Sequence, residues 1–180
     1  MTPETLTKIY RLLYDAFGPQ HWWPGETPFE IMTGAILTQN TSWTNVEKAI
    51  KNLKSAEYLI PAGLHHIDIS QLAELIRPAG YYNIKAKRLK NFVDWLFDSY
   101  NGEITNLQTV ETGRLREELL AIKGIGRETA DSILLYALGR PVFVVDAYTA
   151  RITIRHELTD PDADYEQLRE LFESNLPEDV

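Results

Sequence analysis

Apolar side chains recur every three to four residues along most of the chain, which is the spacing of one face of an α-helix. The first such series is Leu6, Ile9, Leu13 and Phe17. The same spacing predicts further helices at residues 27–37, 42–53, 69–80, 83–102, 110–122, 127–139, 146–158 and 165–176. The only strand-like run, residues 142–145, is too short to form a sheet. The pattern therefore predicts an all-α protein.

Local signals support the helix boundaries. Thr27 precedes Pro28, and Glu30 follows three positions after the threonine, which is the sequence of a capping box. Pro78 and Gly80 stop another helix. We therefore expect well-defined helix ends at these positions.

Composition is that of an ordinary globular protein of one domain or two small ones: 180 residues, 44% hydrophobic and 24% charged. There is no apolar run near 18 residues, and the first ten residues lack the basic and apolar regions of a signal peptide. We therefore expect a cytoplasmic protein that does not contact membranes. The sequence contains no cysteine, which excludes disulfides, thiolate catalysis and an iron–sulfur cluster within this stretch.

The net charge of −8 at first argues against a nucleic-acid partner, but the charge is unevenly distributed. Residues 157–180 hold nine acidic residues and one basic residue, whereas residues 1–156 hold 17 of each. Within residues 81–92 the chain concentrates Lys85, Lys87, Arg88 and Lys90. A local basic face is what DNA binding requires, so we expect one there.

A glycine hairpin, Gly124-Ile125-Gly126, joins two predicted helices. Glycine permits the tight turn and leaves the amides open to an anion at a helix N-terminus. Lys123 and Arg127 flank the turn with positive charge, and Ile125 is expected to hold the two helices together. A DNA phosphate suits this site, although the same sequence also suits an ordinary corner between helices.

A single carboxylate, Asp146, precedes a predicted helix twenty residues after the hairpin. Taken alone, it reads as a helix N-cap. Taken with the hairpin, residues 122–152 (IKGIGRETADSILLYALGRPVFVVDAYTARI) resemble the helix–hairpin–helix–Gly/Pro–Asp superfamily of base-excision DNA glycosylases. Residues 32–53 (MTGAILTQNTSWTNVEKAIKNL) resemble the segment of endonuclease III-like members that carries a glutamine on a loop, and the whole resemblance covers roughly residues 20–175.

The resemblance implies a protein that grips double-stranded DNA and flips a damaged base into a pocket. It implies that Asp146 stabilises the sugar as the glycosidic bond breaks, or activates water. It also implies that Gln39 fills the hole left by the base, although a polar loop residue is the simpler interpretation. The residues expected to contact DNA are Gln39, Asn40, Thr41, Lys123, Gly124, Ile125, Gly126, Arg127 and Thr129.

One residue departs from the pattern of bifunctional members, which place a lysine two residues after the second glycine of the hairpin. That lysine forms a Schiff base with C1′. Here the position is Glu128, and a carboxylate cannot form an imine. We therefore expect a monofunctional glycosylase that uses water, although Glu128 also suits the exposed first turn of a helix.

Aromatic residues indicate which class of damaged base the protein binds. The pattern WWP…ILTQNTxW…RPAGYYNxKAKRL is most similar to endonuclease III-like 3-methyladenine DNA glycosylases, in which aromatic side chains sandwich the base. Alkylated purines are cationic, so indole faces bind them well. The expected base pocket is Trp22, Trp23, Pro24, Trp43 and Glu128, although paired tryptophans also occur in cores.

The resemblance implies a monomer with two helical lobes and an active-site cleft between them. We expect a middle lobe of residues 20–120 and a second lobe of residues 1–19 plus 121–180, without the C-terminal part that family members carry. No cofactor is required within this chain; a 4Fe–4S cluster is expected only if a further C-terminal segment supplies cysteines. Hairpins of this kind can hold a monovalent cation, which is expected here at the carbonyls of Leu120, Ile122 and Ile125.

Three other functions fit the same residues. One is a bifunctional glycosylase/lyase for oxidised pyrimidines that uses another lysine, such as Lys123. Another is a glycosylase for a different base. The last is a non-catalytic hairpin module that only binds DNA, in which Asp146 has no role.

Overall fold

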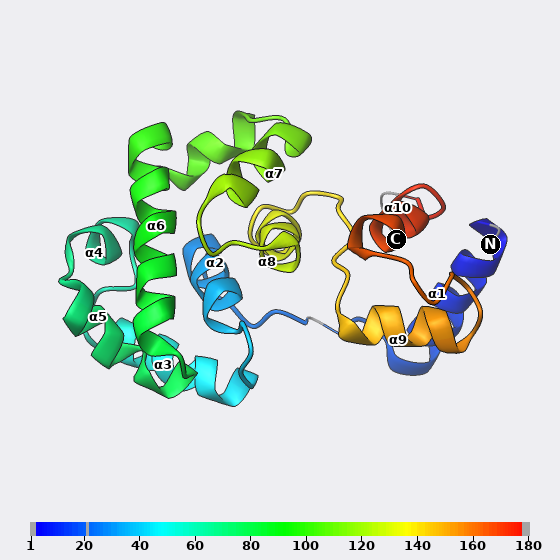
Figure 1. The fold of residues 1–180 in the computed structure, drawn as a ribbon, viewed down its shortest axis with the longest axis horizontal. Helices are drawn as coiled ribbons and strands as arrows, with labels where there is room; N and C mark the ends of the chain where they lie inside the picture. Colours follow the sequence, from blue (N-terminus) through cyan, green and yellow to red (C-terminus); the bar gives the residue numbers. More distant parts are fainter. Residues whose placement is uncertain (1–2, 21, 178–180) are drawn as a thin grey trace. The chain divides into compact units, whose positions relative to one another are not determined.

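The computed structural model describes residues 3–20 and 22–177, which form helices and connecting turns without any strand (Figure 1). In chain order these are α1 (Pro3–Phe17), α2 (Pro28–Leu37), α3 (Trp43–Ser55), α4 (Pro61–His66), α5 (Ile69–Leu75), η1 (Arg77–Ala79), α6 (Tyr82–Tyr100), η2 (Ile104–Thr109), α7 (Thr112–Ala121), α8 (Arg127–Ser132), η3 (Ile133–Ala137), α9 (Ala147–Arg155) and α10 (Tyr165–Glu173). η1 and η2 are 3₁₀-helices, and η3 is a π-helix that continues α8. The all-α prediction is confirmed.

The chain divides into two compact units. The larger is residues 24–140, and the smaller combines residues 1–23 with residues 141–180. The hairpin at 124–126 belongs to the larger unit, together with the elements expected for the middle lobe. The two-lobed arrangement expected from the sequence stays a prediction, because each unit is described by itself.

The core of the larger unit forms around α6, the longest helix, against which α2, α4 and α5 pack (Figure 1). α6 buries Leu89, Phe92, Val93 and Leu96 along one face. α2 is buried nearly all round, as expected for a helix with almost no polar face. Burial of this kind is the main source of the unit's stability.

Cationic side chains of the larger unit cap helix C-termini, where carbonyl groups lack partners within the helix. Lys85 donates from Nζ to Leu37 O (2.8 Å) at the end of α2 and to Ala79 O (2.7 Å) at the end of η1. Lys90 donates to the carbonyls of Leu64, His65 and Ile67 at the end of α4. These contacts fix the loops that follow the helices.

The prediction of a basic face at residues 81–92 is therefore wrong. Lys85 is 1% exposed, and Lys90 is half-buried against α4. Arg88 is also half-buried and donates to a protein side chain, which leaves Lys87 as the exposed cation of the four. Because one turn of a helix is 3.6 residues, Lys85, Arg88 and Lys90 lie toward the buried side of α6.

The capping box expected at α2 consists of two hydrogen bonds, and one of them forms. Thr27 Oγ1 accepts from Glu30 N at 3.2 Å, as expected. The carboxylate of Glu30 instead accepts from Glu26 N and pairs with Lys54 Nζ at 2.9 Å. An available ammonium therefore replaces the threonine amide as the partner of Glu30.

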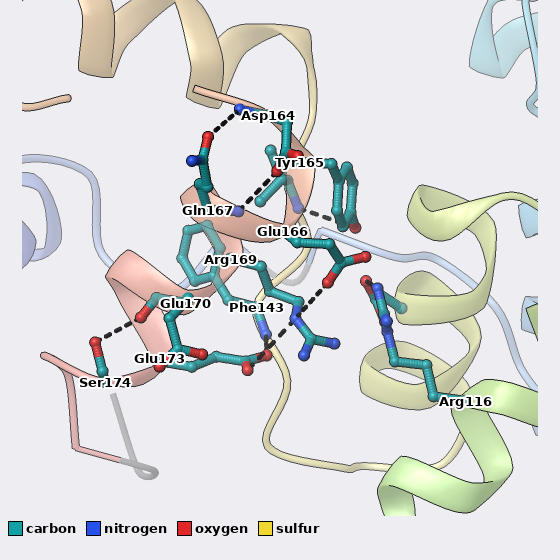
Figure 2. Close-up of polar contacts among 12 residues, drawn as sticks. Arg116, Phe143, Asp164, Tyr165, Glu166, Gln167, Arg169, Glu170, Glu173 and Ser174 are labelled. Atoms are coloured by element: carbon teal, nitrogen blue, oxygen red, sulfur yellow. Dashed lines mark hydrogen bonds and ion pairs between the residues drawn. The ribbon is translucent and has the colours of Figure 1, made fainter. Parts of the chain in front are cut away.

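The smaller unit contains α1, α9 and α10, and side chains cap the starts of α9 and α10. At α10 the Asp164 carboxylate accepts from Gln167 N (3.0 Å), while Gln167 Oε1 accepts from Asp164 N (2.8 Å) (Figure 2). Phe143 stacks on Phe172 with ring centroids 4.0 Å apart, and its amide donates to Glu173. The extended run 142–145 is thus attached to α10 and pairs with no strand within the described residues.

Most predicted helices are confirmed within a few residues, and the sequence pattern missed α4 and the 3₁₀-helix η2. At six residues each, both are too short to show a period. None of the described helices is long and apolar enough to span a bilayer.

Candidate active site

The hairpin is a tight turn between α7 and α8. Ile125 N donates to Ile122 O (3.0 Å), and Gly124 has φ +103°, a left-handed value that favours glycine. Ile125, the residue expected to hold the two helices together, is buried, and Ile122 is buried with it. The backbone between them is thereby presented at the surface.

A buried ion pair fixes the two helices on either side of the hairpin. Arg116 on α7 donates to both carboxylate oxygens of Asp131 on α8, at 2.7 and 3.1 Å. Asp131 is completely buried. Two parallel hydrogen bonds of this kind set both distance and angle, so the hairpin sits on a rigid base.

The two hairpin glycines differ in their surroundings. A Cβ added at Gly124 would lie 2.4 Å from Arg88 Cγ, whereas a Cβ added at Gly126 would meet no atom within 4 Å. Gly124 is therefore required by the protein's own packing. Gly126 is exposed and has φ −98°, so its small size leaves room for an outside ligand.

The start of α8 can receive an anion. Lys123, Gly126, Arg127 and Glu128 are exposed, and Gly126 is the N-cap of α8 without a side chain over the first amides. The first amides of a helix have no carbonyl one turn earlier and favour a negative group. Lys123 and Arg127 add charge on either side.

Gln39 lies on the hairpin. Its Nε2 donates to Gly124 O (3.1 Å) and to Thr129 Oγ1 (2.9 Å), and its Oε1 accepts from Arg88 Nη1. The structure thus brings together Gln39, Gly124 and Thr129, three residues predicted to contact DNA. Thr129 itself is buried, with its hydroxyl turned to Gln39.

The loop around Gln39 is short and ordered by its own backbone. Asn40 is exposed with a left-handed φ of +53°, and Thr41 N donates to Thr38 O at 3.2 Å. Thr41 Oγ1 also accepts from Asn45 on α3. The loop therefore presents Asn40 at its tip.

Asp146 is the N-cap of α9, in the smaller unit. Its Oδ1 accepts from Thr149 N (2.7 Å) and from Thr149 Oγ1 (2.9 Å), while Asp146 N donates back to Thr149 Oγ1. Oδ2 accepts no hydrogen bond from the described residues. Oδ1 thus anchors the carboxylate at the start of α9.

The aromatic residues of the expected base pocket are divided between the units. Trp22 is 72% exposed and Trp23 is half-buried, both in the smaller unit. Exposed Pro24 and half-buried Trp43, the first residue of α3, belong to the larger. The base pocket formed by these four residues and Glu128 therefore stays a prediction.

Ligands for a cluster or a metal ion are the next feature of the site. The sequence has no cysteine, so these residues do not fit an iron–sulfur cluster, and the described residues hold no group of three His, Asp or Glu side chains that would bind a metal. Ile122 O, one of the three carbonyls expected for a monovalent cation, accepts the hairpin's own hydrogen bond. That cation stays a prediction.

Residues behind the hairpin were missed by sequence reasoning. Asn91 Nδ2 donates to Lys123 O (2.8 Å), and Arg88 lies one turn earlier on α6. The sequence did contain a signal for Arg88 and Asn91. They are polar residues three positions apart on an amphipathic helix, so they share one face of that helix with buried residues.

Known proteins match this chain over nearly its whole length. The family model for the HhH-GPD superfamily of base excision DNA repair proteins matches residues 33–178. A "Putative DNA repair glycosylase" of Methanocaldococcus jannaschii is 52% identical over 178 residues, 98% of this chain and 81% of the relative.

Two solved structures extend the comparison. The crystal structure of H. pylori 3-methyladenine DNA glycosylase bound to 1,N6-ethenoadenine is 35% identical, with a TM-score of 0.80 over 97% of this chain and 82% of that one. A non-covalent endonuclease III–DNA complex has a TM-score of 0.83 at 24% identity, over 99% of this chain and 79% of that one, which shows the shared fold. The chain therefore belongs to the HhH-GPD superfamily of base excision DNA repair proteins and is a DNA N-glycosylase.

Proposed function

We propose that this enzyme is a monofunctional glycosylase that removes N-alkylated purines from double-stranded DNA. The observation that carries the absence of lyase chemistry is Glu128, exposed on the first turn of α8 at the position where bifunctional relatives place a lysine. A carboxylate cannot attack C1′ to form a Schiff base. Water is then the nucleophile.

The class of base is inferred from chemistry and from similarity. Trp22, Trp23 and Trp43 offer indole faces, which attract a cationic alkylated purine through stacking and cation–π interaction. The 3-methyladenine glycosylase that this chain resembles binds a modified adenine. An alkylated purine also leaves readily as a neutral base, so the site needs little acid catalysis.

Asp146 is proposed as the catalytic residue. As the bond between C1′ and the purine nitrogen breaks, the electron pair leaves with the base and the sugar becomes oxocarbenium-like. Asp146 Oδ2 stabilises this positive charge, and a water then adds to C1′ and gives its proton to the carboxylate or to solvent. Thr149 holds Oδ1 and so fixes the direction of Oδ2.

The hairpin and the loop before α3 are proposed to hold the DNA. Amides at 124–127 grip a phosphate, and Gln39 fills the hole left when the damaged base is flipped into a pocket. Phosphate contacts fix the position of the DNA without reading its sequence. We also propose that the enzyme is a monomer and that it acts in the cytoplasm.

The test is a base-release assay on matched duplexes that carry 3-methyladenine, 1,N6-ethenoadenine, hypoxanthine or thymine glycol. We expect free alkylated purine by mass spectrometry, an intact abasic strand, and nicking only after hot alkali. Borohydride is expected to trap no covalent protein–DNA complex, because trapping needs a Schiff base. Release of thymine glycol with efficient trapping would replace this proposal by a glycosylase/lyase that uses another lysine.

Lys123 is the lysine to test in that case. It is exposed on the hairpin, with its carbonyl held by Asn91. Lys123→Gln would abolish trapping if this amine were the nucleophile. Under the monofunctional proposal, the same variant weakens DNA binding and leaves the product an intact abasic strand.

A further inference from the structure

The side-chain amide of Gln39 is bound at both ends by protein atoms. Its oxygen accepts from Arg88 on α6, and its nitrogen donates to Gly124 O and Thr129 Oγ1 on the hairpin. We call Gln39 with these three partners the Gln39 latch. All four residues lie in the larger unit, so the latch needs no contribution from the smaller one.

Arg88 is built into the latch along its whole length. Its aliphatic stem fills the space beside Gly124, where an added Cβ would lie 2.4 Å from Cγ and 3.0 Å from Cδ. Its guanidinium then reaches Gln39 Oε1. Asn91, one turn further along α6, donates to Lys123 O at 2.8 Å and holds the same turn of the hairpin. The stem therefore supports the hairpin, while the charged end acts on Gln39.

A side chain that fills a hole in a duplex cannot keep these contacts. Gln39 must exchange its bonds to Arg88, Gly124 and Thr129 for contacts with DNA. A hydrogen bond from a charged donor is stronger than one between neutral groups, so the bond from Arg88 is the principal restraint. The free energy needed to break this hydrogen bond makes binding less favourable for any DNA into which Gln39 inserts.

We propose that Arg88 is a positioning residue that holds Gln39 on the hairpin and thereby sets the threshold for its insertion into DNA. An intact duplex offers no hole, so Gln39 stays latched there. A duplex that has lost a stacked base offers one, and the exchange becomes favourable. Arg88 thus sharpens the difference in affinity between damaged and intact DNA. This inference rests on the proposed insertion of Gln39.

The test uses Arg88→Met, which keeps an aliphatic stem beside Gly124 and removes the donors. Binding is measured by fluorescence anisotropy on two duplexes of one sequence, one intact and one with a tetrahydrofuran abasic analogue. We expect affinity for the abasic analogue to rise about tenfold or more, which corresponds to one hydrogen bond from a charged donor. Affinity for the intact duplex stays unchanged, and Arg88→Lys restores part of the wild-type behaviour.

The control is the same substitution in a Gln39→Ala background, where it should have no effect on either duplex. A merely structural Arg88 would instead weaken binding to both duplexes in both backgrounds, and that result would overturn the proposal. Weaker binding of Arg88→Met to the abasic analogue alone would also overturn it, because Arg88 would then favour insertion.

A second measurement separates the latch from the proposed role of Gln39. In the protein alone, ¹⁵N NMR of the Gln39 side-chain amide should report a restrained group in the wild type and a mobile one in Arg88→Met. A mobile amide in the wild type would overturn the latch. If Gln39→Ala bound the abasic analogue as well as the wild type, insertion would be wrong, and a restrained amide would still demonstrate the contacts.

Discussion

Asp146 caps a helix in the structure and is also the residue proposed to act in catalysis. It caps α9 through Oδ1 and leaves Oδ2 without a partner among the described residues. The helix-capping interpretation and the catalytic interpretation therefore do not compete. A cap that fixes one oxygen also aims the other, which is the kind of preorganisation that electrostatic catalysis needs.

Asp146→Asn tests the catalytic half of this pair. Asparagine is as good an N-cap as aspartate, so the thermal unfolding midpoint should change little. Base release should fall by roughly 10²-fold or more, because an uncharged amide does not stabilise the developing cation. Single-turnover release from an alkylated duplex measures this, and duplex affinity serves as the control. Undiminished release would remove Asp146 from the mechanism.

The two hairpin glycines give a matched pair at the same scale. Gly126→Ala meets open space and keeps an ordinary φ, so the fold should tolerate it while the phosphate loses its close approach. All duplexes should then bind more weakly by a similar factor. Gly124→Ala instead clashes with Arg88 and strains a φ of +103°, so it should lower the unfolding midpoint. Unaltered binding by Gly126→Ala would make the hairpin an ordinary corner.

At the scale of elements, the prediction from sequence succeeds where one period dominates and fails where a polar side chain has a buried partner. The long helix α6 was visible from its apolar spacing, and the hairpin from its glycines. The roles of Lys85, Lys90 and Arg88 were not, since a lysine that caps a neighbouring helix looks like any surface lysine in the sequence. Such contacts depend on which helices pack together, and the periodicity of the sequence does not contain that information.

Lys85 links two of these elements, and its loss should be costly. Lys85→Met would leave the carbonyls of Leu37 and Ala79 buried without a donor, which should lower the free energy of unfolding by about 2 kcal/mol or more. Urea unfolding measures this. Lys87→Met, an exposed position on the same helix, is the control and should have little effect.

The same lysine predicts a pH dependence. Burial, with the nearby charge of Arg88, lowers the pKa of Lys85 from 10.5 to about 8. Between these values the unfolded chain binds the proton and the folded one does not, so the stability due to Lys85 rises with pH in this window. The difference in unfolding free energy between wild type and Lys85→Met should therefore grow from pH 8 to pH 10. A constant difference would contradict the lowered pKa.

For the whole molecule, the net charge of −8 shows how little a total says about a DNA-binding surface. Acidic residues crowd into residues 157–180, whereas the hairpin carries Lys123 and Arg127. The sequence was sufficient for the fold class and for the hairpin, Gln39 and Asp146 as candidates. The positions of Trp22 and Trp23 relative to Trp43 depend on how the two units are arranged, which no local pattern in the sequence encodes.

Neutralising part of this acidic segment tests the whole-molecule effect. Asp160→Asn with Asp162→Asn, both in the turn before α10, should strengthen duplex binding at low salt and have almost no effect at 0.15 M, where charges beyond about 8 Å are screened. Titrations at several salt concentrations measure this. The slope of log affinity against log salt near physiological salt should match the wild type, since the phosphate contacts are the same. A lower slope would place these residues in the DNA interface.

The division into two units also has a consequence for how the protein is made. The larger unit is one uninterrupted stretch, so its core can form as soon as the ribosome has released residues 24–140. The smaller unit unites α1 with α9 and α10, so α1 is synthesised first and completes its unit last. Leu6 on α1, which is buried in the folded protein, therefore remains without its partners for most of synthesis, and a chaperone that binds exposed apolar helices would find the nascent chain there.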